Sequence, residues 1–149
     1  QLPIIKMLRK YQPEIVLANS VHDRHPDHGK AAKLVADACF LSGLIKIETG
    51  QEAWRPKAVY HYIQDEYIHP DLTINITPYM DKKMESIKAY SSQFYTPDSD
   101  LPETPISGKD FLEFLIGRAK LVGRPIGAKY AEGFTAARNV GVKNLFDLV

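Results

Sequence analysis

A short, continuous apolar run does most to constrain the fold of this chain. Residues 15–18 read Ile-Val-Leu-Ala and stand between Glu14 and Asn19. A run of this length is typical of a strand buried on both faces, as in a parallel sheet. Apolar spacing predicts a helix before it, over residues 3–10, and another after it, over residues 29–42. This succession of helix, strand, polar loop and helix predicts an α/β fold.

The rest of the chain continues the alternation of strands and helices. Apolar spacing predicts two further strands and two further helices: strands over residues 58–63 and 72–77, and helices over residues 78–91 and 110–122. Residues 93–107 hold three prolines among polar residues and predict a long irregular loop. Residues 127–134 also read as irregular, and residues 145–149 (Leu-Phe-Asp-Leu-Val) are expected to pack as an apolar terminus.

Composition and charge narrow the class of protein. The 149 residues are 44% hydrophobic and 25% charged, which is enough for a buried core in one domain and excludes a disordered chain. The net charge of +1 gives no electrostatic case for binding nucleic acid or an anionic membrane. Cys39 is the single cysteine, so no internal disulfide is possible, and its apolar helical surroundings predict a small core residue. This suits a reducing compartment, and we expect a cytoplasmic protein.

The densest polar segment follows the first predicted strand. Residues 22–28 (His-Asp-Arg-His-Pro-Asp-His) hold three histidines and two aspartates. Ligands of open α/β sheets bind beyond the carboxyl ends of strands, so this segment is well placed to form a site. With Pro26 fixing the turn, His25 and His28 can face one cleft, and neutral imidazole is a common metal ligand. Asp27 is placed to hold one tautomer of the His25 ring.

A purely structural interpretation competes with this one. Asp27 could be only a helix N-cap, with the histidines on a solvated turn. His22 could add a metal ligand or simply position the loop, and His61, in a predicted strand, fits a core histidine better than a partner of the site. A catalytic zinc takes three protein ligands and a water, whereas this segment offers one or two.

Four segments carry a resemblance to a known family. Residues 24–32 (Arg-His-Pro-Asp-His-Gly-Lys-Ala-Ala) resemble the second motif of the LmbE/PIG-L zinc-dependent N-acetylglucosamine deacetylases. Residues 60–64, 88–94 and 127–134 are similar to the bacillithiol-biosynthesis branch, which acts on N-acetylglucosaminyl malate. The resemblance implies a Rossmann-like three-layer sandwich with a mostly parallel sheet, a homo-oligomer, and a small-molecule amino-sugar glycoside as substrate.

The same resemblance implies roles for particular residues. His28 would be a zinc ligand, and His25 would act as the imidazolium that stabilises the tetrahedral intermediate or protonates the leaving amine. Asp27 would orient His25, and Tyr130 would donate to the developing oxyanion. Arg24 would face a carboxylate of the substrate, although it could equally be a surface ion-pair partner.

One departure from the family is large. Its first motif, His-Pro-Asp-Asp-x-Glu, supplies two zinc ligands and the general base, and it does not occur in these 149 residues. The His-Pro-Asp at residues 69–71 lies after the second motif and reads as a turn. We therefore expect residues 1–149 to be the C-terminal portion of one LmbE-like domain, lacking N-terminal strands, inactive alone and not retaining zinc. The alternatives are a non-catalytic structural or binding portion of an assembly, or another metallohydrolase such as a phosphoesterase.

Overall fold

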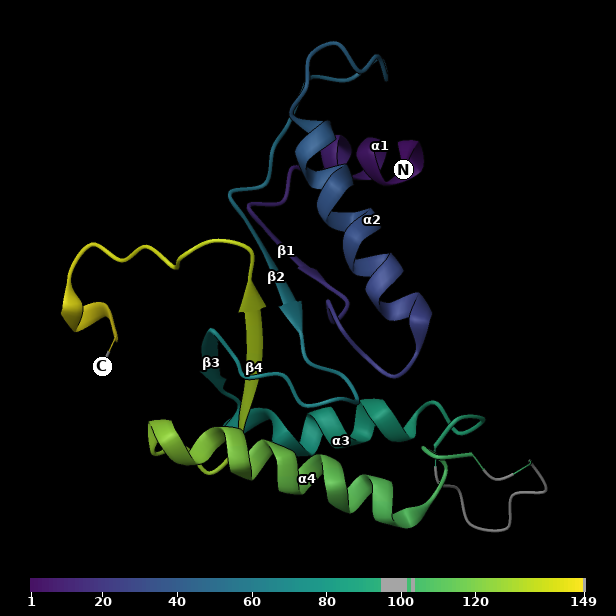
Figure 1. Ribbon diagram of the computed structural model, residues 1–149, viewed down its shortest axis with the longest axis vertical. Coiled ribbons are helices and arrows are strands. Elements are labelled where there is room, and N and C mark those ends of the chain that lie inside the picture. Colours follow the sequence, from purple (N-terminus) through teal and green to yellow (C-terminus); the bar gives the residue numbers. More distant parts are fainter. Residues whose placement is uncertain (95–101, 103, 149) are drawn as a thin grey trace. The chain divides into compact units, whose positions relative to one another are not determined.

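The computed structural model describes residues 1–94, 102 and 104–148 and is a mixed α/β structure, as predicted (Figure 1). The chain divides into two compact units: unit 1 holds residues 1–72 and 133–149, and unit 2 holds residues 73–132. The helices are α1 (Leu2–Tyr11), α2 (Pro26–Ser42), α3 (Met80–Lys88) and α4 (Lys109–Gly123), and the strands are β1 (Ile15–Ala18), β2 (Ala58–Tyr62), β3 (Leu72–Asn75) and β4 (Ala131–Ala136). Within the described residues, no helix is both long and apolar enough to cross a bilayer.

The strands form one sheet in the order β1-β2-β4-β3. β1 and β2 are parallel, with Ile15 opposite Ala58 and Ala18 opposite His61. β4 pairs with β2 in the antiparallel sense, with Phe134 opposite Tyr62. The parallel pairing matters for function because it brings the carboxyl ends of β1 and β2 to the same edge of the sheet.

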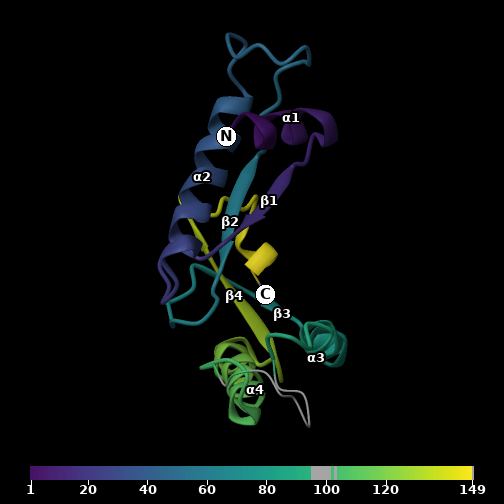
Figure 2. The same ribbon diagram turned by 90° about the vertical axis from the view of Figure 1, so that its right-hand side faces the viewer.

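The core of unit 1 lies between the helices and one face of the parallel strands. α2 runs alongside β1 and β2 (Figures 1 and 2). Four buried residues form the centre of this core: Ile5 and Leu8 of α1, and Ala38 and Cys39 of α2. Val16 and Val59 pack against them from the strands. Cys39 is thus the core residue that the sequence predicts, and burial raises the pKa of its thiol.

β1 is covered on one face only, which corrects the expectation of burial on both. Ile15 and Leu17 are each 58% exposed, whereas Ala18 is buried. The reason is that α1 and α2 both pack against the face that carries Val16. A continuous apolar run indicates that a strand can be buried on both faces, but it does not predict which elements cover each face.

Two expectations near the C-terminus are wrong. β4 is a strand where the sequence predicts an irregular segment, because it pairs with β2. Gly133 lets Pro70 lie close to this strand: a Cβ at Gly133 would lie 2.8 Å from Cβ of Pro70. The apolar terminus does not pack, since Leu145 is 80% and Phe146 85% exposed. The loop expected over residues 93–107 lies largely outside the described residues, as does Val149.

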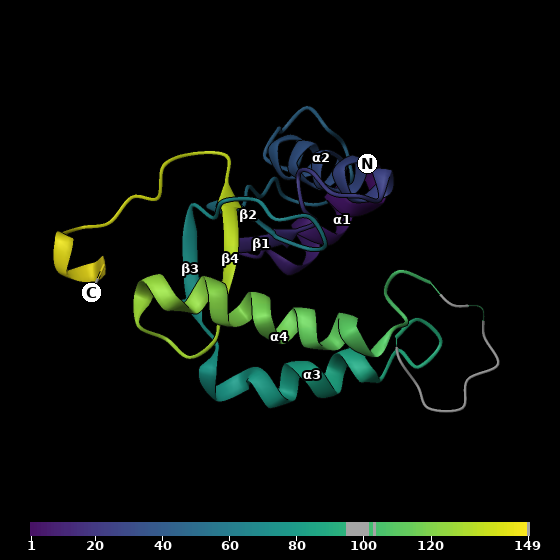
Figure 3. The same ribbon diagram turned by 60° about the horizontal axis from the view of Figure 1, so that its bottom comes forward.

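Unit 2 is built around two helices that lie side by side (Figure 3). Its core consists of Ile76, Met80 of α3 and Ala119 of α4, all buried. Met84 and Ile116 pack against this cluster. Apolar spacing predicts both helices, although the first of them begins at Met80 and a 3₁₀ turn occupies Thr77–Tyr79.

A buried arginine fastens the end of α2 in unit 1. Arg9, on α1, is 4% exposed. Its guanidinium donates to the carbonyl oxygens of Ser42 (3.0 Å), Leu44 (2.8 Å) and Ile47 (2.6 Å) and to the hydroxyl of Thr49 (2.8 Å). These carbonyls belong to the last turn of α2 and the segment after it, so Arg9 replaces the helical partners that this turn lacks.

We predict that Arg9→Ala lowers the free energy of unfolding by about 3 kcal/mol, because four charged hydrogen bonds of a buried side chain are lost. Arg9→Lys should lose about half as much, since an ammonium has three donors and no planar fork. Denaturant titrations of the three proteins measure the difference. Equal losses in both variants would show that the fork geometry does not matter.

Candidate functional site

The site begins where β1 ends. Asn19 and Ser20 follow the strand, and the loop then leads into α2, whose first residue is Pro26. His25 is the N-cap of α2: its Nδ1 accepts the backbone N–H of Asp27 at 3.3 Å. The expectation that Asp27 could be the N-cap is therefore wrong, and His25 has that role instead. His28 falls in the first turn of α2, so one helix start positions both histidines.

The first turn of α2 presses against the loop backbone at Gly29. A Cβ at Gly29 would lie 3.2 Å from the carbonyl oxygen of Val21, which is closer than a side chain usually tolerates. Glycine therefore permits this approach. It keeps the neighbouring residue, His28, close to the loop that precedes the helix.

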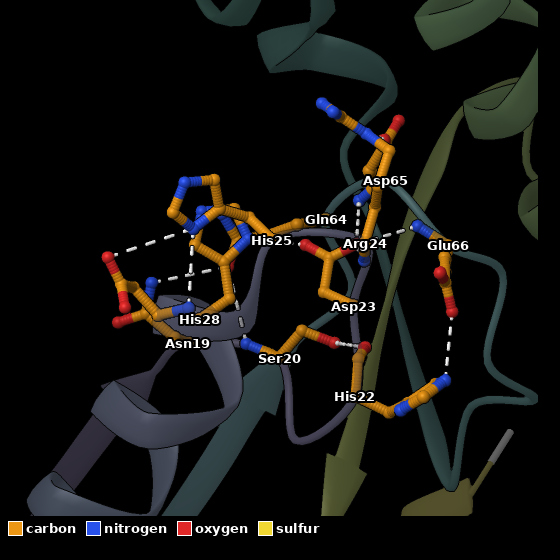
Figure 4. A network of polar contacts seen from close by, with 11 residues as sticks. Asn19, Ser20, His22, Asp23, Arg24, His25, His28, Gln64, Asp65 and Glu66 are labelled. Atoms are coloured by element: carbon orange, nitrogen blue, oxygen red, sulfur yellow. Dashed lines mark hydrogen bonds and ion pairs between the residues drawn. The ribbon is translucent and has the colours of Figure 1, made fainter.

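The central contact of the site joins Asp23 to His28. Oδ2 of Asp23 lies 2.5 Å from Nδ1 of His28, and the Asp23 side chain is fully buried (Figure 4). An ionised carboxylate accepts hydrogen bonds and donates none, so Nδ1 of His28 carries the proton. If the ring carries no second proton, Nε2 keeps its lone pair. The ring is one-third exposed, at 32%.

The other oxygen of Asp23 binds the backbone of two segments. Oδ1 accepts the N–H groups of Arg24 (2.9 Å), Asp65 (3.2 Å) and Glu66 (2.9 Å). Burial raises the pKa of Asp23, but the hydrogen bonds from Glu66, His28, Arg24 and Asp65 outweigh burial, and the pKa lies below its ordinary value. Asp23 is therefore an anion at neutral pH.

The end of β2 completes the surroundings of His28. Oε1 of Gln64 accepts the side-chain amide of Asn19 at 3.2 Å, and Nε2 of Gln64 lies 3.5 Å from Nε2 of His28. His61, in β2, is buried, and its Nδ1 lies 2.8 Å from the carbonyl oxygen of Asn19. His61 is thus the satisfied core histidine that the sequence predicts, and it fastens β2 to the end of β1.

His25 and Asp27 lie beside His28. The ring centroids of His25 and His28 are 5.3 Å apart, with the planes tilted by 33°. Oδ2 of Asp27 is 3.9 Å from Nδ1 of His25, beyond hydrogen-bond distance, and both side chains are more than half exposed. The capping contact already uses Nδ1 of His25 as an acceptor, so orientation of His25 by the Asp27 carboxylate stays a prediction.

Two ion pairs form the exposed rim of the site. Nε of Arg24 donates to Oδ2 of Asp65 at 2.6 Å, and this hydrogen bond raises the pKa of the guanidinium. Nε2 of His22 lies 2.9 Å from Oε2 of Glu66. Arg24 therefore has the surface ion-pair partner that was one of its two predicted roles, and His22 faces the loop after β2.

Tyr130 belongs to unit 2. Its backbone N–H donates to Oγ1 of Thr77 at 3.1 Å, and its carbonyl accepts the N–H of Ile76 at 3.0 Å. Its ring packs against the unit 2 core, with Nζ of Lys129 5.2 Å from the ring centroid. The other four predicted residues lie together in unit 1: Arg24, His25, Asp27 and His28. That Tyr130 joins them stays a prediction.

The donor set fits one ligand of a metal ion. His28 presents Nε2 while a carboxylate holds Nδ1, the arrangement found around metal-bound histidines. No group of three or more His, Cys, Asp or Glu side chains placed to hold a metal occurs among residues 1–94, 102 and 104–148. This part of the chain therefore offers one well-oriented donor, and a metal site would need others.

Sequence reasoning missed three residues that shape the site. They are Asp23, Gln64 and Asp65, which hold His28, Asn19 and Arg24 respectively. One signal could have found two of them. Residues 64–66 (Gln-Asp-Glu) directly follow a predicted strand, and neighbouring parallel strands end at the same edge of a sheet.

Comparison with known structures finds proteins that share this fold. No family model matches the chain. The conserved protein TT1542 from Thermus thermophilus is similar over 95% of this chain and 59% of its own, with a TM-score of 0.83 and 28% identity. The N,N'-diacetylchitobiose deacetylase from Pyrococcus horikoshii, solved with an inhibitor, is similar over 99% of this chain and 55% of its own, with a TM-score of 0.69 and 25% identity.

A third structure has the same fold and is named for another activity. GalB, the 4-carboxy-2-hydroxymuconate hydratase from Pseudomonas putida, matches with a TM-score of 0.73 and 22% identity over 96% of this chain and 60% of its own. This chain thus spans between 55% and 60% of the length of the three structures. The first two similarities support the LmbE/PIG-L superfamily, the third shows the fold alone, and none of them tests the bacillithiol branch.

Two histidines outside the first turn of α2, His61 and His22, give a test of the site's support. His61→Leu should lower the free energy of unfolding by about 1–3 kcal/mol, because the carbonyl oxygen of Asn19 loses the ring of a buried histidine as its partner. His22→Gln, at an exposed position, should change it by less than about 0.5 kcal/mol. Thermal and urea unfolding measure both. A His61 variant as stable as the parent would show that this contact does not support the end of β1.

Proposed function

We propose that this chain forms part of a metal-dependent hydrolase that removes the acetyl group from an N-acetylglucosaminyl substrate. One observation carries the proposal: His28 stands beyond the carboxyl end of β1 with Nδ1 bound to a buried carboxylate 2.5 Å away. Nε2 of the neutral ring is then the donor that a divalent cation requires.

Similarity to known structures supports the reaction class. The Pyrococcus horikoshii protein is, by its name, a deacetylase of an acetylated amino sugar, and 99% of this chain aligns with it. The hydratase shows that the fold alone does not decide the chemistry, so the proposal depends on the site and on the Arg-His-Pro-Asp-His segment at residues 24–28.

The metal would be zinc, held by Nε2 of His28 together with ligands from outside the described residues. When bound, zinc supplies a Lewis acid for the acetyl carbonyl. The role of Asp23 is to hold the ring that binds it. His25, which is more than half exposed beside His28, would pass a proton to the departing amine. The Asp27 carboxylate, 3.9 Å from Nδ1 of His25, would stabilise the imidazolium. Tyr130 would donate to the developing oxyanion.

Arg24 would select the aglycone. Its guanidinium lies at the rim of the site and donates to Asp65, so a substrate carboxylate would compete with Asp65 for the same donor. A guanidinium that binds one carboxylate can bind another in the same geometry. This supports N-acetylglucosaminyl malate, the substrate of bacillithiol biosynthesis, as the finer proposal. A cytoplasmic homo-oligomer belongs to the same proposal.

Two substitutions separate metal binding from proton transfer in the protein that carries this chain. His28→Ala should lose zinc on desalting, because a ligand is gone. His25→Ala should keep zinc and lose turnover by about 10²–10⁴-fold, the usual contribution of a general acid. Metal analysis by mass spectrometry and acetate release from N-acetylglucosaminyl malate measure the two effects.

The control is Lys33→Ala, on the exposed side of α2, where Lys33 pairs with Asp37. It should keep both zinc and turnover. Native turnover in the His25 variant would overturn the role given to His25. Hydrolysis of a phosphodiester with no action on any N-acetyl sugar would favour a phosphoesterase. Absence of both zinc and activity in the parent protein would favour a structural or binding role.

A further inference from the structure

We propose that Asp23 is the positioning residue of this site, because its carboxylate fixes His28 in the tautomer that leaves Nε2 free to bind a divalent cation. This inference rests on the proposed function for the cation, and it adds a residue that the motif at residues 24–28 does not contain. Asp23 touches neither substrate nor metal and acts only through His28.

The first argument is the number of donors around Asp23. Its side chain is fully buried and accepts four hydrogen bonds, three from backbone N–H groups and one from the imidazole. A buried carboxylate is costly unless its oxygens are satisfied in this way. Since it receives three backbone donors on Oδ1, only Oδ2 is available to the ring, and the ring must supply the proton.

The second argument comes from the contact of the other nitrogen of the same ring. Nε2 of His28 faces the side-chain amide of Gln64 at 3.5 Å, so the ring lies between Asp23 and Gln64 (Figure 4). A neutral imidazole has one donor and one acceptor nitrogen. With Nδ1 as the donor to Asp23, Nε2 is the acceptor toward Gln64 or toward a cation that replaces it.

The third argument is that Asp23 joins two loops. The N–H groups of Asp65 and Glu66 both bind Oδ1, and these residues follow β2, whereas His28 follows β1. Contacts from the loops that follow two parallel strands therefore fix the position of the His28 ring. A ligand held in this way needs little reorganisation to bind a cation.

Asp23→Asn tests the inference because it changes the proton pattern and keeps the shape. The amide oxygen can still accept the three backbone N–H groups. The amide nitrogen now faces the ring as a donor, so Nδ1 of His28 must become the acceptor and its proton must move to Nε2. The matched control is Asp71→Asn, since the Asp71 carboxylate also accepts a backbone N–H (Ala136, 2.7 Å) and lies outside the His28 network.

The readout is ¹⁵N NMR of the histidine rings at about pH 8 in the metal-free form of the full protein that carries this chain, followed by titration with Zn²⁺. We expect the Nδ1–H form of His28 in the parent and in Asp71→Asn, and the Nε2–H form in Asp23→Asn. We expect Zn²⁺ to shift the His28 signals of Asp23→Asn only at concentrations about 10–100-fold higher than in the parent.

The possible outcomes are separable. An Nε2–H ring in the parent, or an unchanged Nδ1–H ring in Asp23→Asn, would overturn the inference. If Asp23→Asn does not fold, the parent spectrum alone decides, since it must show the Nδ1–H form. If the tautomer changes as expected while Zn²⁺ shifts no His28 signal even in the parent, Asp23 keeps its positioning role and the proposed metal function fails.

Discussion

The contact between Asp23 and His28 is the interaction on which the rest of the site depends. A carboxylate without solvent exposure is unfavourable, and four hydrogen bonds offset that cost here. Three of the four come from the backbone and would serve a purely structural purpose. The fourth comes from an imidazole at 2.5 Å, and the ring that donates it is partly exposed. The buried carboxylate of Asp23 therefore binds a side chain that a ligand can reach from solvent.

Much of this site is local in the sequence, and the local part could be predicted. Three local features stand close together in the chain: the apolar run at residues 15–18, Pro26, and the spacing of His25 and His28. The structure places both histidines at the start of α2, as this order predicts. The partners of the loop are distant: Asp65 lies 41 residues from Arg24, and Gln64 lies 45 residues from Asn19. The parallel pairing of β1 and β2 brings them together, and the local sequence does not say which strands pair.

The fold shows the same division between local and distant causes. The helices follow from their apolar spacing, whereas β4 contains alanine and glycine, which are poor strand formers. Gly133 is required there because Pro70 lies against it, a contact between segments far apart in the sequence. Arg9 is a charged residue in the core for a similar reason. Its partners are carbonyls of residues 42–47, which amphipathic spacing on α1 alone cannot reveal.

Orientation and ligand number are separate requirements of the metal centre that we propose, and the described residues meet only the first. His28 is oriented by Asp23 before any cation arrives, so the entropic cost of fixing the ring is met by folding. The described residues nevertheless bring no group of three potential ligands together. A single imidazole binds a divalent cation weakly, however well it is oriented. On the proposed function, affinity would therefore come from further donors, and the loop after β1 would set the geometry at which His28 meets the cation.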